Sequence, residues 1–321
     1  MASDLIVQAA ILLISLAALA KASQYVIENA VILARFFRIS EATVGFVLIS
    51  VSTSLPELSV AVISSSAGEG ALSVGNVIGS NIADLTLIIG ICAFIRPILV
   101  KKRDMMEIMK ILLITSIIPL ILIYTGNLDK FGGLLLLAIF VAYVFYVSRK
   151  KIDLEKGDNI RRPQALRAFL LFCGGILAVL LTSSFAVNSA VAISDMTGIA
   201  KTFIGATIIA LGTSLPELAV DIQAMRRRRY SLALGDAIGS AMTNLTLVLG
   251  VTGLFNPQII YMSIFLTIML FLLITNLVLM YFMSTNNRIT KKEGAMLLAL
   301  YAIFLLVTSG VQISVSHLLP F

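Results

Sequence analysis

Two glutamates of this chain lie within apolar segments, and each belongs to the same six-residue sequence. Thr-Ser-Leu-Pro-Glu-Leu occurs at residues 53–58 and again at residues 213–218, which places Glu57 and Glu217 at equivalent positions. A charged side chain at the centre of a membrane helix costs roughly 2.5–3.5 kcal/mol on insertion scales. We therefore expect both carboxylates to face a polar cavity or to bind a cation.

A proline precedes each glutamate and adds further oxygen ligands to the motif. Pro56 has no N–H group, so the carbonyl of Ser52 loses its helical partner, and Pro216 does the same for Gly212. Interrupted backbone at membrane depth is tolerated where it lines a cavity. We predict that the freed carbonyls, the hydroxyls and the carboxylates form one cluster of oxygens. Its side chains are those of Thr53, Ser54, Glu57, Thr213, Ser214 and Glu217.

A second sequence shared by the two halves adds polar side chains. It reads Gly-Asn-x-x-Gly-Ser up to Ser80 and Gly-Asp-x-x-Gly-Ser up to Ser240. The glycine spacing predicts close helix packing. Ser80 and Asp84 are four residues apart and share one helix face, as do Ser240 and Asn244. We add these four residues to the candidate ligands.

Every candidate ligand is an oxygen donor, which indicates a hard cation. Ca²⁺ takes six to eight oxygen ligands in flexible geometry, and oxygen ligands in general suit hard ions. Three carboxylates, Glu57, Asp84 and Glu217, carry a formal charge of −3 when ionised, which suits one divalent ion or several monovalent ions. Mutually exclusive binding at shared ligands predicts antiport. We expect no tightly bound cofactor, only transported hard cations.

The composition is typical of an α-helical membrane protein. Of the 321 residues, 59% are apolar and 13% are charged, whereas a soluble domain is about a quarter charged. The apolar runs are long enough to cross a bilayer as helices, which takes roughly 20 residues. We predict an all-α integral membrane protein with ten transmembrane helices, at residues 4–34, 41–66, 71–95, 104–125, 131–149, 165–193, 202–225, 231–255, 259–284 and 294–315.

The predicted helices divide into two halves of five, residues 1–150 and 151–321, joined by a linker at about 150–163. Gly45–Gly90 aligns without a gap with Gly205–Gly250 at a constant offset of 160, and 18 of the 46 aligned residues are identical. Because five is an odd number, the second half enters the membrane in the opposite orientation. Such an inverted repeat is typical of secondary transporters with a binding site near the midplane.

The distribution of basic residues supports the count of ten helices. In this arrangement the loop lysines and arginines gather on one side, and the other side has only Lys130 and Lys201. Basic loops are cytoplasmic, so we expect a multi-pass cell-membrane protein with both termini extracellular. Membrane lipid and inorganic cations are the expected partners, nucleic acid is not, and the chain is expected to function as a monomer.

The doubled motif resembles the paired repeats of the sodium/calcium exchanger family, within the cation/calcium exchanger superfamily. The resemblance rests on Thr-Ser-Leu-Pro-Glu in both halves, each followed by Gly-Asn/Asp-x-x-Gly-Ser, and the short central loop is similar to that of prokaryotic members. It implies that Glu57 and Glu217 coordinate Ca²⁺ and that the first and sixth helices slide across the core to alternate access. It also implies sodium sites with oxygens from Thr53, Ser54, Ser80, Thr213, Ser214 and Ser240.

The two halves also depart from the family pattern. Ser52 stands where the second copy has Gly212 and where the family usually has glycine. The acid and amide at Asp84 and Asn244 are exchanged relative to some prokaryotic relatives. This leaves the ion preference open, including a proton or potassium role for Asp84.

Two further acids of the second half lie beside the motif. Asp221 is one turn past Glu217, and Asp236 stands where the first half has Asn76. Both are predicted to lie toward the cytoplasmic ends of their helices. They could assist ion entry, but we expect them to be solvated.

Sodium/calcium antiport is the leading hypothesis, and two alternatives remain. A proton/calcium antiporter also uses carboxylates, although a proton needs no cage of hydroxyl oxygens. A cation channel usually builds its filter from a symmetric ring of subunits, whereas one chain carries both copies here. An enzyme is not expected, because the single histidine, His317, lies in the C-terminal tail.

Overall fold

The computed structural model is helical apart from one short strand pair, and it describes residues 2–36, 49–99, 102–126, 128–148, 162–255, 262–285 and 288–318. The helices of the first half are α1 (Ala2–Phe36), α3 (Ile49–Thr53), α4 (Leu55–Ser66), α5 (Gly70–Ile82), the π-helical η2 (Ala83–Ile88), α6 (Ile89–Ile95), α7 (Lys102–Tyr124) and α8 (Lys130–Ser148). Those of the second half are α9 (Arg162–Thr197), α10 (Lys201–Ile204), η3 (Gly205–Ile209), α11 (Ala210–Thr213), α12 (Leu215–Arg226), α13 (Tyr230–Thr243), η4 (Asn244–Val248), α14 (Leu249–Leu254), α15 (Met262–Thr285) and α16 (Lys291–Leu318).

The described helices are suited to cross a membrane. Eight continuous helical stretches are long and apolar enough, two of them made of three consecutive elements each, Gly70–Ile95 and Leu232–Leu254. Counting the bent pair Lys201–Thr213 and Leu215–Arg226 as one further span gives nine within the described residues. The helix predicted at 41–66 is described only from Ile49, so the predicted total of ten is not confirmed. The predicted linker at 150–163 lies outside the described residues up to position 161.

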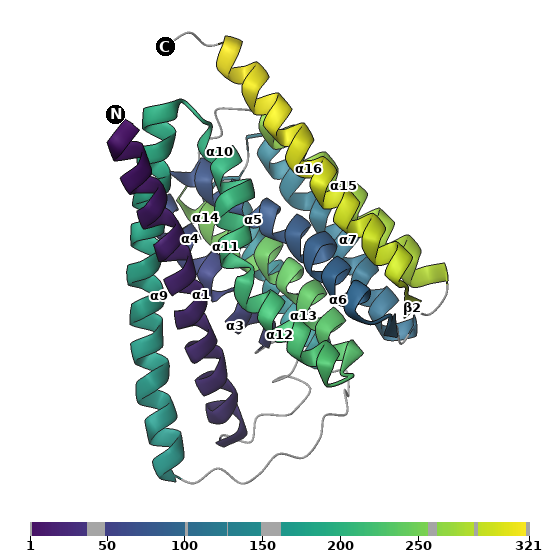
Figure 1. The fold of residues 1–321 in the computed structure, drawn as a ribbon. Coiled ribbons are helices and arrows are strands. Elements are labelled where there is room, and N and C mark those ends of the chain that lie inside the picture. The colour runs from purple at the N-terminus through teal and green to yellow at the C-terminus, as the bar shows by residue number, and fades with distance from the viewer. Residues whose placement is uncertain are drawn as a thin grey trace.

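The two longest helices, α1 and α9, pack side by side along most of their length at one edge of the molecule (Figure 1). They build an apolar cluster of their own with parts of α4, α5 and η3. This cluster includes Leu16, Val60 and Val187 and is separate from the main core. Outward-facing residues of α9 such as Leu170 and Leu181 are each 63% exposed. An exposed apolar surface of this kind is expected to face lipid.

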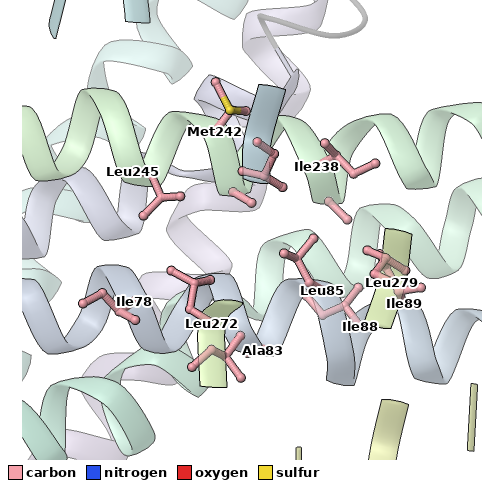
Figure 2. Packing of buried hydrophobic residues seen from close by; sticks show 14 of the residues in the cluster. Ile78, Ala83, Leu85, Ile88, Ile89, Ile238, Met242, Leu245, Leu272 and Leu279 are labelled. Carbon is pink, nitrogen blue, oxygen red and sulfur yellow. The ribbon is translucent and has the colours of Figure 1, made fainter. Parts of the chain in front are cut away.

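The main core forms where α5–η2 crosses α13–η4. Figure 2 shows Ile78 of the first half opposite Leu245 of the second, and Leu85 opposite Ile238. Ile238 and Leu245 are the counterparts of Ile78 and Leu85 at the offset of 160. The Asn81 amide donates a hydrogen bond of 3.1 Å to the carbonyl of Ala241, which is its own counterpart in the repeat. Contact between equivalent residues is what a two-fold relation between the halves produces.

The same relation extends to α7 and α15, which pack against each other. Residues 112–115 and 272–275 both read Leu-Leu-Ile-Thr, again at an offset of 160. The next residues are in contact, because the Asn276 amide donates to the Ser116 hydroxyl over 2.8 Å. The strands β1 (Ile98–Leu99) and β2 (Arg288–Ile289) pair antiparallel and join the halves once more.

The prediction of close packing at the repeated glycines is confirmed for the first half. A Cβ atom on Gly75 would lie 2.2 Å from the Thr202 carbonyl oxygen, and one on Gly79 would lie 2.3 Å from that of Ala206. Neither distance is possible for a real side chain. Glycine here lets α5 lie directly on the backbone of α10 and η3, which brings Ser80 toward the second half.

Candidate cation site

Both glutamate motifs interrupt a helix, as their prolines predict. In the first half α3 ends at Thr53 and α4 begins at Leu55, with Ser54 between them at φ −79° and ψ 9°. In the second half Ser214 separates α11 from α12 with φ −82° and ψ 4°, and the axis bends by 41°. Each proline lies in the first turn of the new helix, where its missing N–H is tolerated. The glutamates therefore follow directly on a helix break.

The carboxylates of these motifs are fully buried. Glu57, Asp84 and Glu217 have no exposed surface, and Asp221 and Asp236 are exposed by only 1% and 2%. The expectation that Asp221 and Asp236 are solvated is therefore wrong. The helix packing covers them, which position along the helix alone did not reveal.

The threonine of the first motif pairs with the serine of the second half. The hydroxyls of Thr53 and Ser240 lie 3.0 Å apart and share a hydrogen bond. Thr53 also lies 3.3 Å from Oδ1 of Asp236, to which its hydroxyl can donate. These residues are more than 180 positions apart in the chain, so only the fold brings them together.

The threonine of the second motif makes the matching contacts with the first half. Its hydroxyl lies 3.3 Å from that of Ser80 and donates to Oδ1 of Asn76 over 3.2 Å. Ser80 also donates to Oε1 of Glu57 over 3.3 Å. The first-half acid, the first-half serine and Thr213 thus form one hydrogen-bonded group.

Several buried oxygens at this centre have no hydrogen-bond partner among the described residues. They include Oε2 of Glu57, both carboxylate oxygens of Asp84 and of Glu217, and the hydroxyls of Ser54 and Ser214. Glu217 lies close enough to Glu57 and Asp84 for their charges to interact. Burying unpaired carboxylates together is costly unless a cation compensates them. The unmatched oxygens make this centre the candidate cation site.

Two π-helical segments lie next to the centre. Asp84 lies in η2, and Asn244 is the first residue of the equivalent η4. π-helical turns are rare and occur frequently at functional sites. The amide atoms of Asn244 have no hydrogen-bond partner among the described residues, and its side chain is fully buried.

The predicted ligands are joined to different degrees. Direct hydrogen bonds connect Thr53 with Ser240, and Thr213 with Ser80 and, through Ser80, with Glu57. The other predicted ligands are buried and have no hydrogen bond to this network among the described residues; they are Ser54, Asp84, Ser214, Glu217 and Asn244. In the described residues no three acidic, histidine or cysteine side chains converge as a metal-binding group. A bound cation would therefore depend on hydroxyl and carbonyl oxygens as well as on carboxylates.

Two residues of this network were not among the ligands predicted from the sequence. Asn76 and Asp236 each accept from a motif threonine. Each precedes a site serine, Ser80 or Ser240, by one helical turn. Residues four positions before each serine share its helix face just as those four positions after it do, so the same spacing could have identified Asn76 and Asp236.

Comparison with known proteins identifies the family. A profile described as "Sodium/calcium exchanger protein" matches residues 7–149 and 167–310. The chain is 29% identical to sodium/calcium exchanger MaX1 of Methanosarcina acetivorans, over 92% of this chain and 97% of the relative. It is also 29% identical to inner membrane protein YrbG of Escherichia coli, over 77% of this chain and 80% of the relative.

The fold is similar to that of a solved exchanger. A structure of the sodium-calcium exchanger NCX_Mj, soaked with Na⁺ and Sr²⁺, matches with a TM-score of 0.66 and 28% identity, over 93% of this chain and 97% of that one. The profile covers both motifs and both sets of site residues. The chain belongs to the sodium/calcium exchanger family, a family of membrane transporters and not of enzymes.

Proposed function

We propose that this chain is a secondary antiporter that exchanges Na⁺ for Ca²⁺ across the membrane by alternating access, at a midplane site formed by both halves. The observation that carries the proposal is the buried centre in which Glu57 and Glu217 have carboxylate oxygens without a hydrogen-bond partner among the described residues, beside hydroxyls that are hydrogen-bonded between the halves. A centre of hard oxygen ligands with excess negative charge suits Ca²⁺ or several Na⁺ ions. Family membership supports the same pair of ions.

The proposed arrangement has ten transmembrane helices as two inverted five-helix repeats, residues 1–150 and 151–321. Contacts between equivalent residues, Asn81 with Ala241 and Ser116 with Asn276, support a two-fold relation of the halves. The one-sided distribution of basic loop residues supports a cell-membrane protein with both termini extracellular. We propose that the single chain, with both copies of the motif, is the functional unit.

In the proposed site Glu57 and Glu217 bind Ca²⁺ together with backbone carbonyls freed by the prolines. Na⁺ ions take hydroxyl oxygens with the same carboxylates, so that the two cargoes exclude each other. The hydroxyl and amide ligands proposed for this role are those of Thr53, Ser54, Ser80, Thr213, Ser214, Ser240 and Asn244, with Asp84 as a further acid.

Movement of α1 and α9 is the proposed means of alternating access. These helices contact the rest of the protein through a separate apolar cluster and few polar bonds, one of which joins Ser183 of α9 to Ser59 of α4. Apolar surfaces impose little directional preference, so a helix pair can slide on them at small cost. The pair lies across the motif helices α3, α4 and α11.

Transport in liposomes tests the proposal. Purified protein is reconstituted, and Ca²⁺ uptake is measured with an outward Na⁺ gradient and then with an outward proton gradient. We expect uptake with Na⁺ and none with protons alone. Uptake driven only by protons would assign a proton/calcium antiporter, and Ca²⁺ leakage without any counter-ion would assign a channel.

A further inference from the structure

Two buried acids extend the central site toward one face of the protein. Asp221 follows Glu217 by four residues on α12, and Asp236 precedes Ser240 by four residues on α13. Each acid is therefore one turn, about 6 Å along its helix, from the central ligands. In both cases the displacement is toward the turn that joins α12 to α13. That turn carries the basic residues 226–229.

The two carboxyl groups are both buried and lie near each other. They are close enough for their side chains to interact electrostatically. Oδ1 of Asp221 and Oδ2 of Asp236 are buried and have no hydrogen-bond partner among the described residues. The other oxygen of Asp236 faces the Thr53 hydroxyl at 3.3 Å. Two adjacent carboxylates repel each other when both are ionised, and a cation between them removes that repulsion.

The first half has no such pair. The residues equivalent to Asp221 and Asp236 are Ala61 and Asn76, which are buried and neutral. The α4–α5 side of the centre therefore lacks, at the equivalent positions, the two carboxylates found on the α12–α13 side. The second half thus has two acids here that the first half lacks, whereas the first half has the additional acid at Asp84, opposite Asn244.

We propose that Asp221, Asp236 and the Thr53 hydroxyl form an access site for the transported cation on the side of the α12–α13 turn. The ligand class is a hard cation, with Ca²⁺ favoured because two carboxylates meet there. This inference rests on the proposed exchange function and adds a difference between the two membrane faces. The access site gives the protein a higher apparent Ca²⁺ affinity at the face of the α12–α13 turn than the same centre has from the opposite face.

The test replaces the pair with its first-half counterparts. The variant Asp221→Ala/Asp236→Asn and the wild type are studied in inside-out and right-side-out membrane vesicles, with radioactive Ca²⁺ as the probe and Na⁺ as the counter-ion. We expect the half-saturating Ca²⁺ concentration to rise about tenfold at the face of the α12–α13 turn, equal to about 1.4 kcal/mol. At the opposite face we expect less than a twofold change.

Controls separate this inference from the exchange function itself. Absence of Na⁺-dependent uptake in the wild type would contradict the proposed function. If the wild type exchanges and the variant has the same half-saturating Ca²⁺ concentration at both faces, the access site alone is contradicted. An equal loss at both faces, in the double variant and in the isosteric Asp236→Asn, would place the effect at the centre and overturn the inference. A changed pH dependence at unchanged Ca²⁺ affinity would also overturn it. Asp195→Asn removes an exposed carboxylate outside the site and is expected to behave as the wild type.

Discussion

In both copies of the glutamate motif the threonine contacts a serine hydroxyl of the other half, but the second polar group beside it is charged in one copy and neutral in the other. Thr53 meets Ser240 and the carboxylate of Asp236, whereas Thr213 meets Ser80 and the amide of Asn76. Repeat symmetry thus preserves the geometry of the threonine contacts while the charge beside them differs. The comparison teaches that a duplicated scaffold can hold two sides of one site in place while each side evolves its own electrostatics.

The glutamates themselves differ in the same way. Oε1 of Glu57 accepts a hydrogen bond from Ser80, while neither oxygen of Glu217 has a partner among the described residues. Ser240, the counterpart of Ser80, is bonded to Thr53. In the proposed site we therefore expect Glu217 to depend more on a bound cation than Glu57 does.

The largest expected effect comes from removing either glutamate charge. Glu217→Gln keeps the size of the side chain and removes a buried charge that, in the proposed site, a cation compensates, and losing one partner of such a pair typically costs about 3 kcal/mol or more. We expect the initial rate of Na⁺-driven Ca²⁺ uptake to fall by at least about 100-fold. Glu57→Gln is expected to lose exchange to a similar or slightly smaller extent.

Gel filtration of each purified variant controls for folding. A Glu217→Gln protein that elutes as the wild type and keeps a rate within about twofold of it would refute the central site.

The acid and amide of the π-helical segments provide the next test. Asp84→Asn removes one negative charge from the centre, and we expect Ca²⁺ uptake to fall about tenfold. Adding Asn244→Asp restores the total charge on the other side. If total charge decides the affinity, the double variant recovers most of the uptake; if it remains as slow as Asp84→Asn alone, the position of the acid is essential.

A smaller effect is expected at the two threonines, and it should be unequal. Thr53→Val removes a hydroxyl that faces a carboxylate, and such contacts are typically worth 1.5–3 kcal/mol, against about 1 kcal/mol for a neutral partner. We expect the half-saturating Na⁺ concentration to rise about tenfold for Thr53→Val and about threefold for Thr213→Val. Equal shifts would show that the difference between Asp236 and Asn76 does not matter for Na⁺.

The smallest effect is expected for a contact between the halves away from the site. Lys201 at the start of α10 pairs with Glu69, just before α5, at 2.7 Å, and both side chains are partly exposed. Exposed ion pairs are worth about 0–1 kcal/mol. Lys201→Met should therefore change the free energy of unfolding by less than about 1 kcal/mol, measured by thermal unfolding in detergent. Exchange should be retained, and a loss of transport would show that this pair is coupled to the site.

Much of the candidate site could be predicted from the sequence because its residues occur in a repeated motif. The two identical six-residue sequences identified Glu57 and Glu217, and helical spacing linked Ser80 to Asp84. The proline rule predicted both helix breaks, and they are confirmed. These features are local, so a sequence reports them without knowledge of the neighbours.

The π-helical segments were not predicted. A π turn shifts the backbone bonding by one residue and leaves the apolar composition unchanged, so hydropathy does not report it. The extent of the predicted helix 41–66 before Ile49 stays a prediction, because that stretch lies outside the described residues.

The sequence by itself determined the membrane class, the doubled acidic motif and the oxygen character of the ligands. Only the tertiary structure decided that Thr53 meets Ser240, that Asn76 and Asp236 join the network, and that Asp221 is buried against Asp236. The physical reason is that helical periodicity specifies which side chains share a face but not which helix that face meets. Whether a carboxylate is solvated or buried depends on that partner, and so does the charge of the site.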